Sequence, residues 1–225
     1  MGVVNRIPIV TNGLVLNLDA ANVKSYPRSG TTWSDLSGNR NTGSLVNGPT
    51  FSSDSGGSIV FDGVDDYVSC GNSNTLQVTI GTISVWMKTT NPGSGYRAII
   101  VKQYSWGLYT KDSVLMTYDF GSAQDRSTGI NIADGNWKNV SMTFTETIGS
   151  PFNNAIIYLN GNSIFTASVK FLNNTLEVQL GSGGESGGST QLLNGTIAAA
   201  YVYNRTLSPQ EVLQNYNAQK SRFGL

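Results

Sequence analysis

The sequence contains no histidine and a single cysteine, and these two scarcities exclude several classes of site. Without histidine there is no Ser-His-Asp or Cys-His nucleophilic machinery, no histidine-containing zinc site and no imidazole general base near neutral pH. The lone Cys70 cannot form an internal disulfide or build a thiolate-ligated zinc or iron–sulfur site. It ends a predicted strand, so we expect a small buried residue there and not a reactive thiol.

Charge is also scarce. Charged residues make up 12% of the chain, and 14 basic residues balance 14 acidic ones. This composition lacks the basic surface of a nucleic-acid-binding protein. No apolar run approaches the ~20 residues that span a bilayer. The first apolar stretches are broken by Asn5, Arg6, Pro8 and Asn12, and no small-residue cleavage site follows. We therefore expect no nucleic-acid partner, no membrane insertion and no secretion signal.

What is present is a series of short strand-like segments, spaced ~8–12 residues apart and separated by turn residues. Val140, Met142 and Phe144, for example, alternate with polar residues, which defines an inward face. The segments are residues 14–18, 59–61, 67–70, 83–87, 98–102, 106–110, 114–118, 140–144, 155–159, 164–169, 176–180 and 197–203. One all-β domain of 225 residues accommodates them, with a core large enough to need no disulfide.

Local signals define the turns, the helix and the ends of this domain. Asn160-Gly161 predicts a hairpin, since a type I′ turn needs positive φ at both central residues. Ser208 and Glu211 predict a capping box, and Pro209 suits the first position of the helix that follows. Residues 1–12 are predicted to form an N-terminal arm and residues 13–225 a single domain. Residues 181–190, rich in glycine and serine, are predicted to be a mobile or partner-ordered loop, or a bare connector.

Two motifs carry a family resemblance. Residues 58–68 read SIVFDGVDDYV, a strand, a turn and a second strand, and residues 195–216 read GTIAAAYVYNRTLSPQEVLQNY, a strand and the predicted helix. Together with Trp86 and Asn160-Gly161, they resemble the laminin-G-like group of the concanavalin A-like lectin/glucanase superfamily, over about residues 13–216. The resemblance implies an all-β jelly-roll sandwich of two antiparallel sheets with one short C-terminal helix.

Aromatic residues within a glycine-containing region, residues 91–109, are candidates for a glycan site. Aromatic rings stack on sugars, and polar groups bond sugar hydroxyls. The predicted glycan-binding residues are Tyr96, Arg97, Tyr104 and Trp106. Tyr96 and Tyr104 rank ahead of Trp106, because loops carry most binding residues. The alternative for Trp106 and Tyr109 is an ordinary strand residue with one face on the core.

The resemblance also implies one calcium ion, since many laminin-G-like modules hold one with carboxylates and carbonyls, the oxygen ligands that hard cations prefer. Asp35 matches a D-x-S-G-N element of the family, and Asp62 is the second predicted ligand. Alternatively, Asp35 caps a turn through the amides of Ser37 and Gly38, and Asp62 accepts hydrogen bonds within its own turn. Where relatives often carry a further Asp, this chain has Ala198.

Glycoside hydrolysis is the enzymatic alternative, because relatives of this sandwich include glucanases that use two carboxylates ~5 to 9 Å apart. Such enzymes carry an E-x-D-x-x-E-like strand, which this sequence lacks. Its glutamates are Glu146, Glu177, Glu185 and Glu211. Glu211 belongs to the predicted capping box, and the acidic cluster of Asp62, Asp65 and Asp66 lies in a turn. We therefore predict a protein that is not an enzyme.

Residues 13–51 and 214–225 are similar to laminin-G-like proteins found among tailed-phage structural proteins. This resemblance implies a virion structural protein (a head decoration, fibre or tail component) whose lectin-like sandwich adheres to glycans or to the host surface. The expected partners are cell-surface glycans and other virion proteins, the latter contacted by strand addition through the arm. Virion proteins of this kind are commonly homotrimers. The expected location is the virion, after synthesis in the host cytoplasm. A free carbohydrate-binding module is the alternative.

Overall fold

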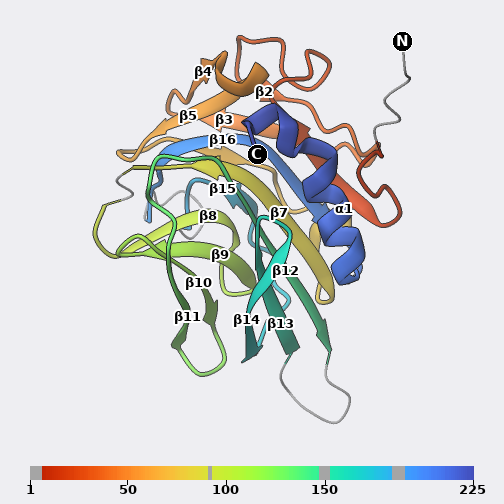
Figure 1. Cartoon of the computed structure of the whole chain (residues 1–225), viewed down its shortest axis with the longest axis vertical. Helices are drawn as coiled ribbons and strands as arrows, with labels where there is room; N and C mark the ends of the chain where they lie inside the picture. Colours follow the sequence, from red (N-terminus) through yellow and green to blue (C-terminus); the bar gives the residue numbers. More distant parts are fainter. Residues whose placement is uncertain (1–6, 91–92, 147–152, 184–190) are drawn as a thin grey trace.

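Two antiparallel β-sheets face each other across an apolar interior in a computed structural model of the chain (Figure 1). The structure describes residues 7–90, 93–146, 153–183 and 191–225. Within these residues each sheet has eight strands, and one α-helix, α1 (Pro209–Gln219), lies close to the C-terminus. The predicted sandwich of two antiparallel sheets with one short C-terminal helix is confirmed.

The first sheet, called sheet A, has the strand order β14-β13-β12-β7-β16-β5-β4, with β1 paired to β16. Its strands are β1 (Leu14–Asp19), β4 (Thr50–Ser52), β5 (Ser58–Asp62), β7 (Gly81–Lys88), β12 (Lys138–Glu146), β13 (Asn153–Leu159), β14 (Asn162–Val169) and β16 (Asn194–Tyr203). The second, sheet B, has the order β11-β10-β9-β8-β15-β6-β3-β2. Its strands are β2 (Thr32–Trp33), β3 (Gly43–Val46), β6 (Tyr67–Ser69), β8 (Tyr96–Lys102), β9 (Trp106–Lys111), β10 (Val114–Asp119), β11 (Gln124–Asn131) and β15 (Val178–Leu180). The described 3₁₀-helices are η1 (Asp54–Gly56), η2 (Asn74–Leu76) and η3 (Lys220–Phe223).

Four of these strands have no counterpart among the predicted segments. β11, at the edge of sheet B, reads QDRSTGIN and has no fully buried residue, so it lacks an apolar alternation. β2, β3 and β4 are two to four residues long and lie in a polar, glycine- and serine-rich stretch. Hydrophobic periodicity detects strands with a sustained buried face, and these strands offer too little of one.

The interior between the sheets is built from alternate residues of their strands. Ile83, Val85 and Met87 of β7 contribute from sheet A, and Leu108 of β9 contributes from sheet B. Cys70 lies in the same core, where burial raises the pKa of its thiol to about 12. The expectation of a buried, unreactive cysteine is therefore confirmed.

The outer face of sheet A is covered by the C-terminal part of the chain. Helix α1 lies over this sheet (Figure 1). Trp86 and Tyr203 belong to a second buried cluster, separate from the interior, together with Val212 of α1 and Phe223 of η3. The ring of Phe223 stacks on Trp86 with centroids 4.0 Å apart, and Tyr216 stacks at 5.7 Å. Arg222 donates hydrogen bonds to the carbonyl oxygens of Ser55 and Gly57 and to the carboxylate of Asp19. The end of the chain is thus tied to sheet A by stacked rings and by one arginine.

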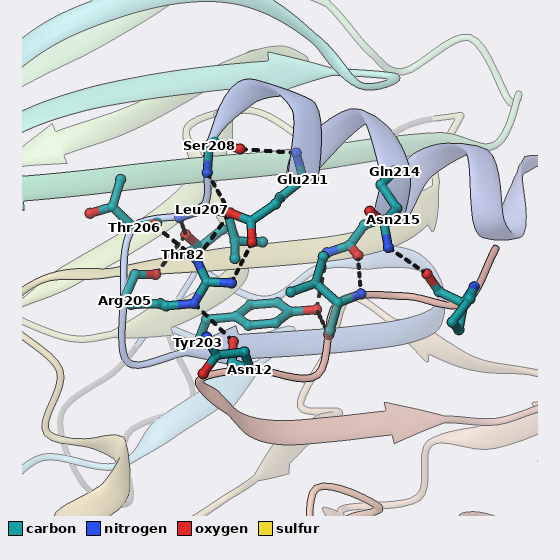
Figure 2. Close-up of polar contacts among 12 residues, drawn as sticks. Asn12, Thr82, Tyr203, Arg205, Thr206, Leu207, Ser208, Glu211, Gln214 and Asn215 are labelled. Atoms are coloured by element: carbon teal, nitrogen blue, oxygen red, sulfur yellow. Dashed lines mark hydrogen bonds and ion pairs between the residues drawn. The ribbon is translucent and has the colours of Figure 1, made fainter.

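The start of α1 has the predicted capping box (Figure 2). Ser208 Oγ accepts a hydrogen bond from the Glu211 amide at 3.3 Å, and the Glu211 carboxylate accepts one from the Ser208 amide at 2.9 Å. Both oxygens of the same carboxylate also accept hydrogen bonds from the Arg205 guanidinium. A hydrogen bond from Arg205 holds the pKa of Glu211 down at about 2, so this glutamate is charged and committed to the helix start.

The described part of the predicted arm, residues 7–12, lies against α1 and β16 (Figure 2). The Val10 amide donates to Asn215 Oδ1 at 2.7 Å, and the Val10 carbonyl accepts from the Tyr203 hydroxyl at 2.9 Å. Gln214 donates to the carbonyl of Pro8, and Arg205 donates to that of Asn12. The backbone groups of Pro8, Val10 and Asn12, part of the arm predicted to bind other virion proteins, are therefore used within this domain. Residues 1–6 lie outside the described residues, as do residues 184–190 of the predicted glycine-rich loop.

None of the described helices has both the length and the apolar character required to cross a membrane.

A β-bulge in β8 decides which residues of this strand face the interior. The pairing of β8 with β9 shifts between Ala98 and Ile100, and both Ile99 and Ile100 lie in the core. Because the bulge adds one residue, Val101 joins Ala98 on the outer face of sheet B and Lys102 points to the opposite side. Without the bulge, alternation from Ala98 would point Val101 toward the inner side of the sheet. With the bulge, Lys102 takes that side and Val101 faces outward.

Lys102 is fully buried, with 0% of its surface exposed. Its Nζ donates to Asn72 Oδ1 at 2.6 Å and to the carbonyl oxygen of Leu176. Both partners are neutral, and burial lowers the pKa of the Lys102 ammonium to about 8. These two neutral contacts thus replace only part of the hydration that the Lys102 ammonium would have in water.

This burial predicts a pH-dependent contribution to stability. Lysine titrates near ~10.4 in an unfolded chain, so between about pH 8 and that value the unfolded chain binds more protons than the folded one. The free energy of unfolding should therefore rise with pH across this window relative to a Lys102→Met variant. Urea denaturation at several pH values measures the difference. The same substitution at the exposed Lys24 is the control, and parallel profiles for wild type and Lys102→Met would contradict the prediction.

Candidate functional site

The outer face of sheet B carries an aromatic cluster that points away from the core. Ala98 and Val101 of β8, Tyr109 of β9 and Met116 of β10 form its buried base. They share this face because Ala98 and Met116 each pair with Tyr109 across the strands. Tyr96, Tyr118 and Phe120 pack against this base from above and are only partly buried. Unlike sheet A, sheet B therefore presents an aromatic face to which no described helix is packed.

A pocket of about 180 Å³ opens in this cluster. Its lining combines five aromatic side chains with two amides. The lining residues are Tyr96, Gln103, Tyr104, Tyr109, Tyr118, Phe120 and Gln191. They come from β8, the turn between β8 and β9, β9, β10 and its end, and the segment that precedes β16. We call this group the aromatic pocket.

The rings around the aromatic pocket meet edge to face. Tyr96 and Tyr118 have centroids 6.0 Å apart with their planes at 90°, and Tyr118 and Phe120 are 5.0 Å apart at 65°. Tyr104 follows, 5.9 Å from Phe120 at 74°. Edge-to-face pairs are the arrangement that ring quadrupoles favour, so the rings hold one another in place. Tyr104, 44% exposed, forms the outermost wall.

A charged pair beside the pocket orients Tyr96. The Tyr96 hydroxyl donates to Asp125 Oδ1 at 2.6 Å, and Lys111 Nζ donates to Asp125 Oδ2 at 2.6 Å. Lys111 Nζ also lies 4.7 Å from the centroid of the Tyr96 ring. Burial opposes the charge on Asp125, but the hydrogen bonds from Lys111 and Tyr96 outweigh it and hold the pKa of this carboxyl below its usual range. The hydrogen bond to Asp125, with burial, raises the pKa of Tyr96, so the phenol keeps its proton.

The structure brings together two of the four predicted glycan-binding residues. Tyr96 and Tyr104 both line the aromatic pocket. Arg97 follows Tyr96 directly in β8, so strand alternation directs its side chain to the other face, and it is not in the lining. Trp106 requires a correction, because its side chain is 0% exposed in the core between the sheets and its indole donates to the Val78 carbonyl at 3.0 Å. A ring at that position offers no face to a sugar.

Four lining residues, Gln103, Tyr118, Phe120 and Gln191, were not singled out from the sequence, and Tyr109 was considered only as an ordinary strand residue. For two of them a signal existed, since Met116, Tyr118 and Phe120 alternate along β10 and its end, which places three large apolar groups on one face. Gln191 has no such signal. It stands beside β8 only because the chain folds back there, where its carbonyl accepts from the Ala98 amide at 2.8 Å.

Asp35, one of the two predicted calcium ligands, has its carboxylate surrounded by hydrogen-bond donors. Oδ1 accepts from the amides of Asn17 (2.9 Å) and Ser37 (2.8 Å), and Oδ2 accepts from the Ser37 hydroxyl (2.7 Å) and the Asn41 amide (3.0 Å). These donors occupy the directions from which a cation would approach. The hydrogen bonds around Asp35 therefore favour a loop-organising carboxylate over a calcium ligand. The Ser37 amide is bonded as the alternative from the sequence expects, and the other amide donors are Asn17 and Asn41, not Gly38.

Asp62, the other predicted ligand, lies with Asp65 and Asp66 in a group whose carboxylate oxygens are within 4.8 Å of one another. Its Oδ1 accepts from the Val64 amide at 2.7 Å, and its own amide donates to Asp66 Oδ2. Burial, together with the charges of Asp62 and Asp65, raises the pKa of Asp66. Three carboxylates are suitable oxygen donors for calcium. Calcium at Asp62 stays a prediction, and Asp35 is not part of this group.

The glutamates considered for hydrolysis do not gather at the aromatic pocket in the described part of the chain. Glu177 accepts a hydrogen bond from the Ser69 hydroxyl at 2.6 Å, and Glu211 holds the start of α1. The Glu146 side chain and Glu185 lie outside the described residues. Among the described lining residues no side chain is a carboxylic acid.

A comparison with protein families identifies the fold family. The model of the concanavalin A-like lectin/glucanases superfamily matches residues 62–213, more than half of the chain. The chain belongs to this superfamily. Its laminin-G-like character, expected from the motifs at residues 58–68 and 195–216, is confirmed. No curated protein matches the sequence.

Solved structures share this superfamily fold at low sequence identity. The binding domain of Paraclostridial Mosquitocidal Protein 1 has a TM-score of 0.68 at 18% identity, over 92% of this chain and 52% of that chain. Domain 4 of AbnA, a GH43 extracellular arabinanase from Geobacillus stearothermophilus in complex with arabinotriose, has a TM-score of 0.65 at 15% identity, over 90% and 98%. Trypanosoma rangeli sialidase in complex with sialic acid has a TM-score of 0.67 at 14% identity, over 93% and 33%. The present chain spans about half the length of the toxin binding domain, and at these identities the likeness shows the fold alone.

The environment of Asp35 generates a prediction about calcium. Asp35→Ala leaves three backbone amides without their acceptor, and we expect it to lower the free energy of unfolding by roughly 2–3 kcal/mol. The loss should be equal in excess calcium and in a chelator, as measured by urea denaturation. Asp62→Asn, at the other predicted calcium ligand, is measured under the same two conditions for comparison. A loss at Asp35 that appears only in the presence of calcium would show instead that this carboxylate binds the ion.

Proposed function

We propose that this protein is a non-catalytic, lectin-like module of a phage virion, and that its aromatic pocket binds glycans. The observation that carries the glycan-binding part is the lining itself, five aromatic side chains and two amides on the exposed face of sheet B. Ligand sites of this kind join apolar walls to a few polar groups that fix the orientation of the ligand.

Each part of the lining has a role in this proposal. The C–H groups of a sugar ring pack on aromatic faces, and its hydroxyls exchange hydrogen bonds with amides and phenols. Tyr104 and Phe120 form the outer wall. At the base, the Tyr109 hydroxyl donates a hydrogen bond to Gln103 Oε1 at 3.4 Å. The lining is held by strands and by ring contacts, so little ordering is required when a ligand arrives.

The structural neighbours support a binding role. They include binding domains of toxins and an arabinanase domain solved with arabinotriose. The Trypanosoma rangeli sialidase is an enzyme, and the present chain matches a third of its length. Most glycoside hydrolases use two carboxylates ~5 to 9 Å apart across the sugar, and sialidases, which use a tyrosine nucleophile, are an exception. The aromatic and amide composition of the described lining supports binding over hydrolysis.

The virion location rests on the sequence. Residues 13–51 and 214–225 are similar to laminin-G-like proteins of tailed phages, and the balanced, sparse charge suits a module displayed on a particle surface. In this proposal the module decorates the head, a fibre or the tail and adheres to glycans of the host surface. A free carbohydrate-binding module would have the same pocket without a particle.

The glycan-binding part predicts that Tyr104→Ala and Phe120→Ala weaken binding by roughly tenfold or more, about 1.4 kcal/mol, because each removes a wall of the pocket. Retention on immobilised polysaccharides, followed by calorimetry with the best ligand, measures the effect. Tyr67→Ala is the aromatic control, since Tyr67 lies on the outer face of sheet B outside the lining. Equal affinity of all three variants and the wild type would contradict the proposal.

The virion part predicts that the protein co-purifies with phage particles from a lysate. Quantitative mass spectrometry should find it at a reproducible copy ratio to the major capsid protein. The size of the ratio distinguishes a head decoration from a component of the tail. Its absence from purified particles, together with retention of the soluble protein on a polysaccharide, would favour a free module.

A further inference from the structure

We infer, on the basis of the proposed function, that the aromatic pocket takes a single uncharged sugar ring at the end of a glycan chain, and not the interior of a polymer. Three independent features of the pocket carry this inference: its size, the orientation of its rings and the charge of its surroundings.

The volume limits the ligand to one ring. The pocket measures about 180 Å³, whereas sites for drug-sized ligands measure roughly 300–1,000 Å³. Its lining is drawn from adjacent strands, β8 to β10, and does not continue to the other half of sheet B. Tyr67 of β6 lies two strand spacings from β8, about 10 Å, and is not in the lining. A bound chain would therefore find no second aromatic subsite in this direction among the described residues.

The orientation of the rings favours a chain end. A flat, extended polymer packs on several rings that lie in one plane, because each stacked sugar then meets a parallel aromatic face. Here neighbouring rings are turned by 90°, 65° and 74° along the series Tyr96, Tyr118, Phe120 and Tyr104. Such rings form a cup with walls, which surrounds one terminal group and blocks the path of a chain through it.

The surroundings carry no net charge that would select an acidic sugar. Among the described residues no lysine, arginine or carboxylate lines the pocket. The charged groups bonded to the Tyr96 hydroxyl are Lys111 and Asp125, which are paired with each other at 2.6 Å, and Arg97 donates to the Tyr96 backbone carbonyl. A carboxylate sugar would lose water without gaining a cation, a costly exchange.

The polar groups of the pocket suit hydroxyls or an acetamido group. The Oε1 atom of Gln191 is buried and has no hydrogen-bond partner among the described residues. The terminal torsion of a glutamine is soft, so a half-turn of the amide exchanges its donor and acceptor sides. The group can thus meet either partner on a neutral sugar.

In the experiment, one protein preparation is titrated with sugars that differ in chain length and in charge. Calorimetry or NMR titration uses arabinose, galactose and N-acetylglucosamine, an oligosaccharide series built on whichever sugar binds, and N-acetylneuraminic acid and galacturonic acid as charged probes. We expect the monosaccharide and its trisaccharide to bind within about threefold of each other. The charged sugars should bind at least roughly tenfold more weakly, and Tyr67→Ala should leave all affinities unchanged.

The outcomes separate this inference from the function on which it rests. An affinity that rises tenfold or more with each added sugar, or a preference for the acidic sugars, overturns the single neutral ring while glycan binding stands. Binding that survives in the Tyr104→Ala, Phe120→Ala double variant places the sugar elsewhere and overturns the pocket itself. The absence of binding by any probe overturns both.

Discussion

The hydrogen bonding of β16 along both of its edges is the interaction on which the rest of the structure depends. One edge pairs with β7 over residues 196–203, and the other pairs first with β5 and then with β1. The Ala20 amide donates to the Ala198 carbonyl where one partner gives way to the next. Nearly every residue of β16 is buried, and its middle consists of three alanines. Strands from the beginning, middle and end of the chain meet on this one element, so sheet A is complete only when the C-terminal segment is in place.

Because of this arrangement, the two outer faces of the sandwich are covered differently by the chain. Both carry aromatic residues, Trp86 and Tyr203 on sheet A and Tyr109 and Tyr118 on sheet B. The segment after β16 turns back as α1 and η3 and covers the first face, where Phe223 stacks on Trp86. Residues 7–12 complete that cover from the other end of the chain. Among the described residues no helix packs on the outer face of sheet B, and its aromatic residues form a pocket.

The fold could be predicted from the sequence because its signals are local. Alternating apolar residues, the turn at Asn160-Gly161 and the capping box of Ser208 and Glu211 each occupy a few neighbouring positions, and the structure contains each one. The site could be predicted only in part, since its composition depends on which face of the sheet each side chain occupies. Trp106 and Tyr104 are two residues apart, yet one is in the core and the other is at the surface. Gln191 reaches the pocket through a tertiary contact that no local pattern encodes.

The extra residue at Ile99-Ile100 has a consequence for how this region can change over evolutionary time. Beyond the bulge, the direction of every β8 side chain depends on the one extra residue. Val101 faces outward and Lys102 inward only because of it. Exchanging one amino acid for another on the aromatic face alters a single wall of the pocket. Deleting one residue from the strand would instead exchange inside for outside at all later positions at once. Diversification of ligand preference in this hairpin should therefore proceed by substitution at constant length.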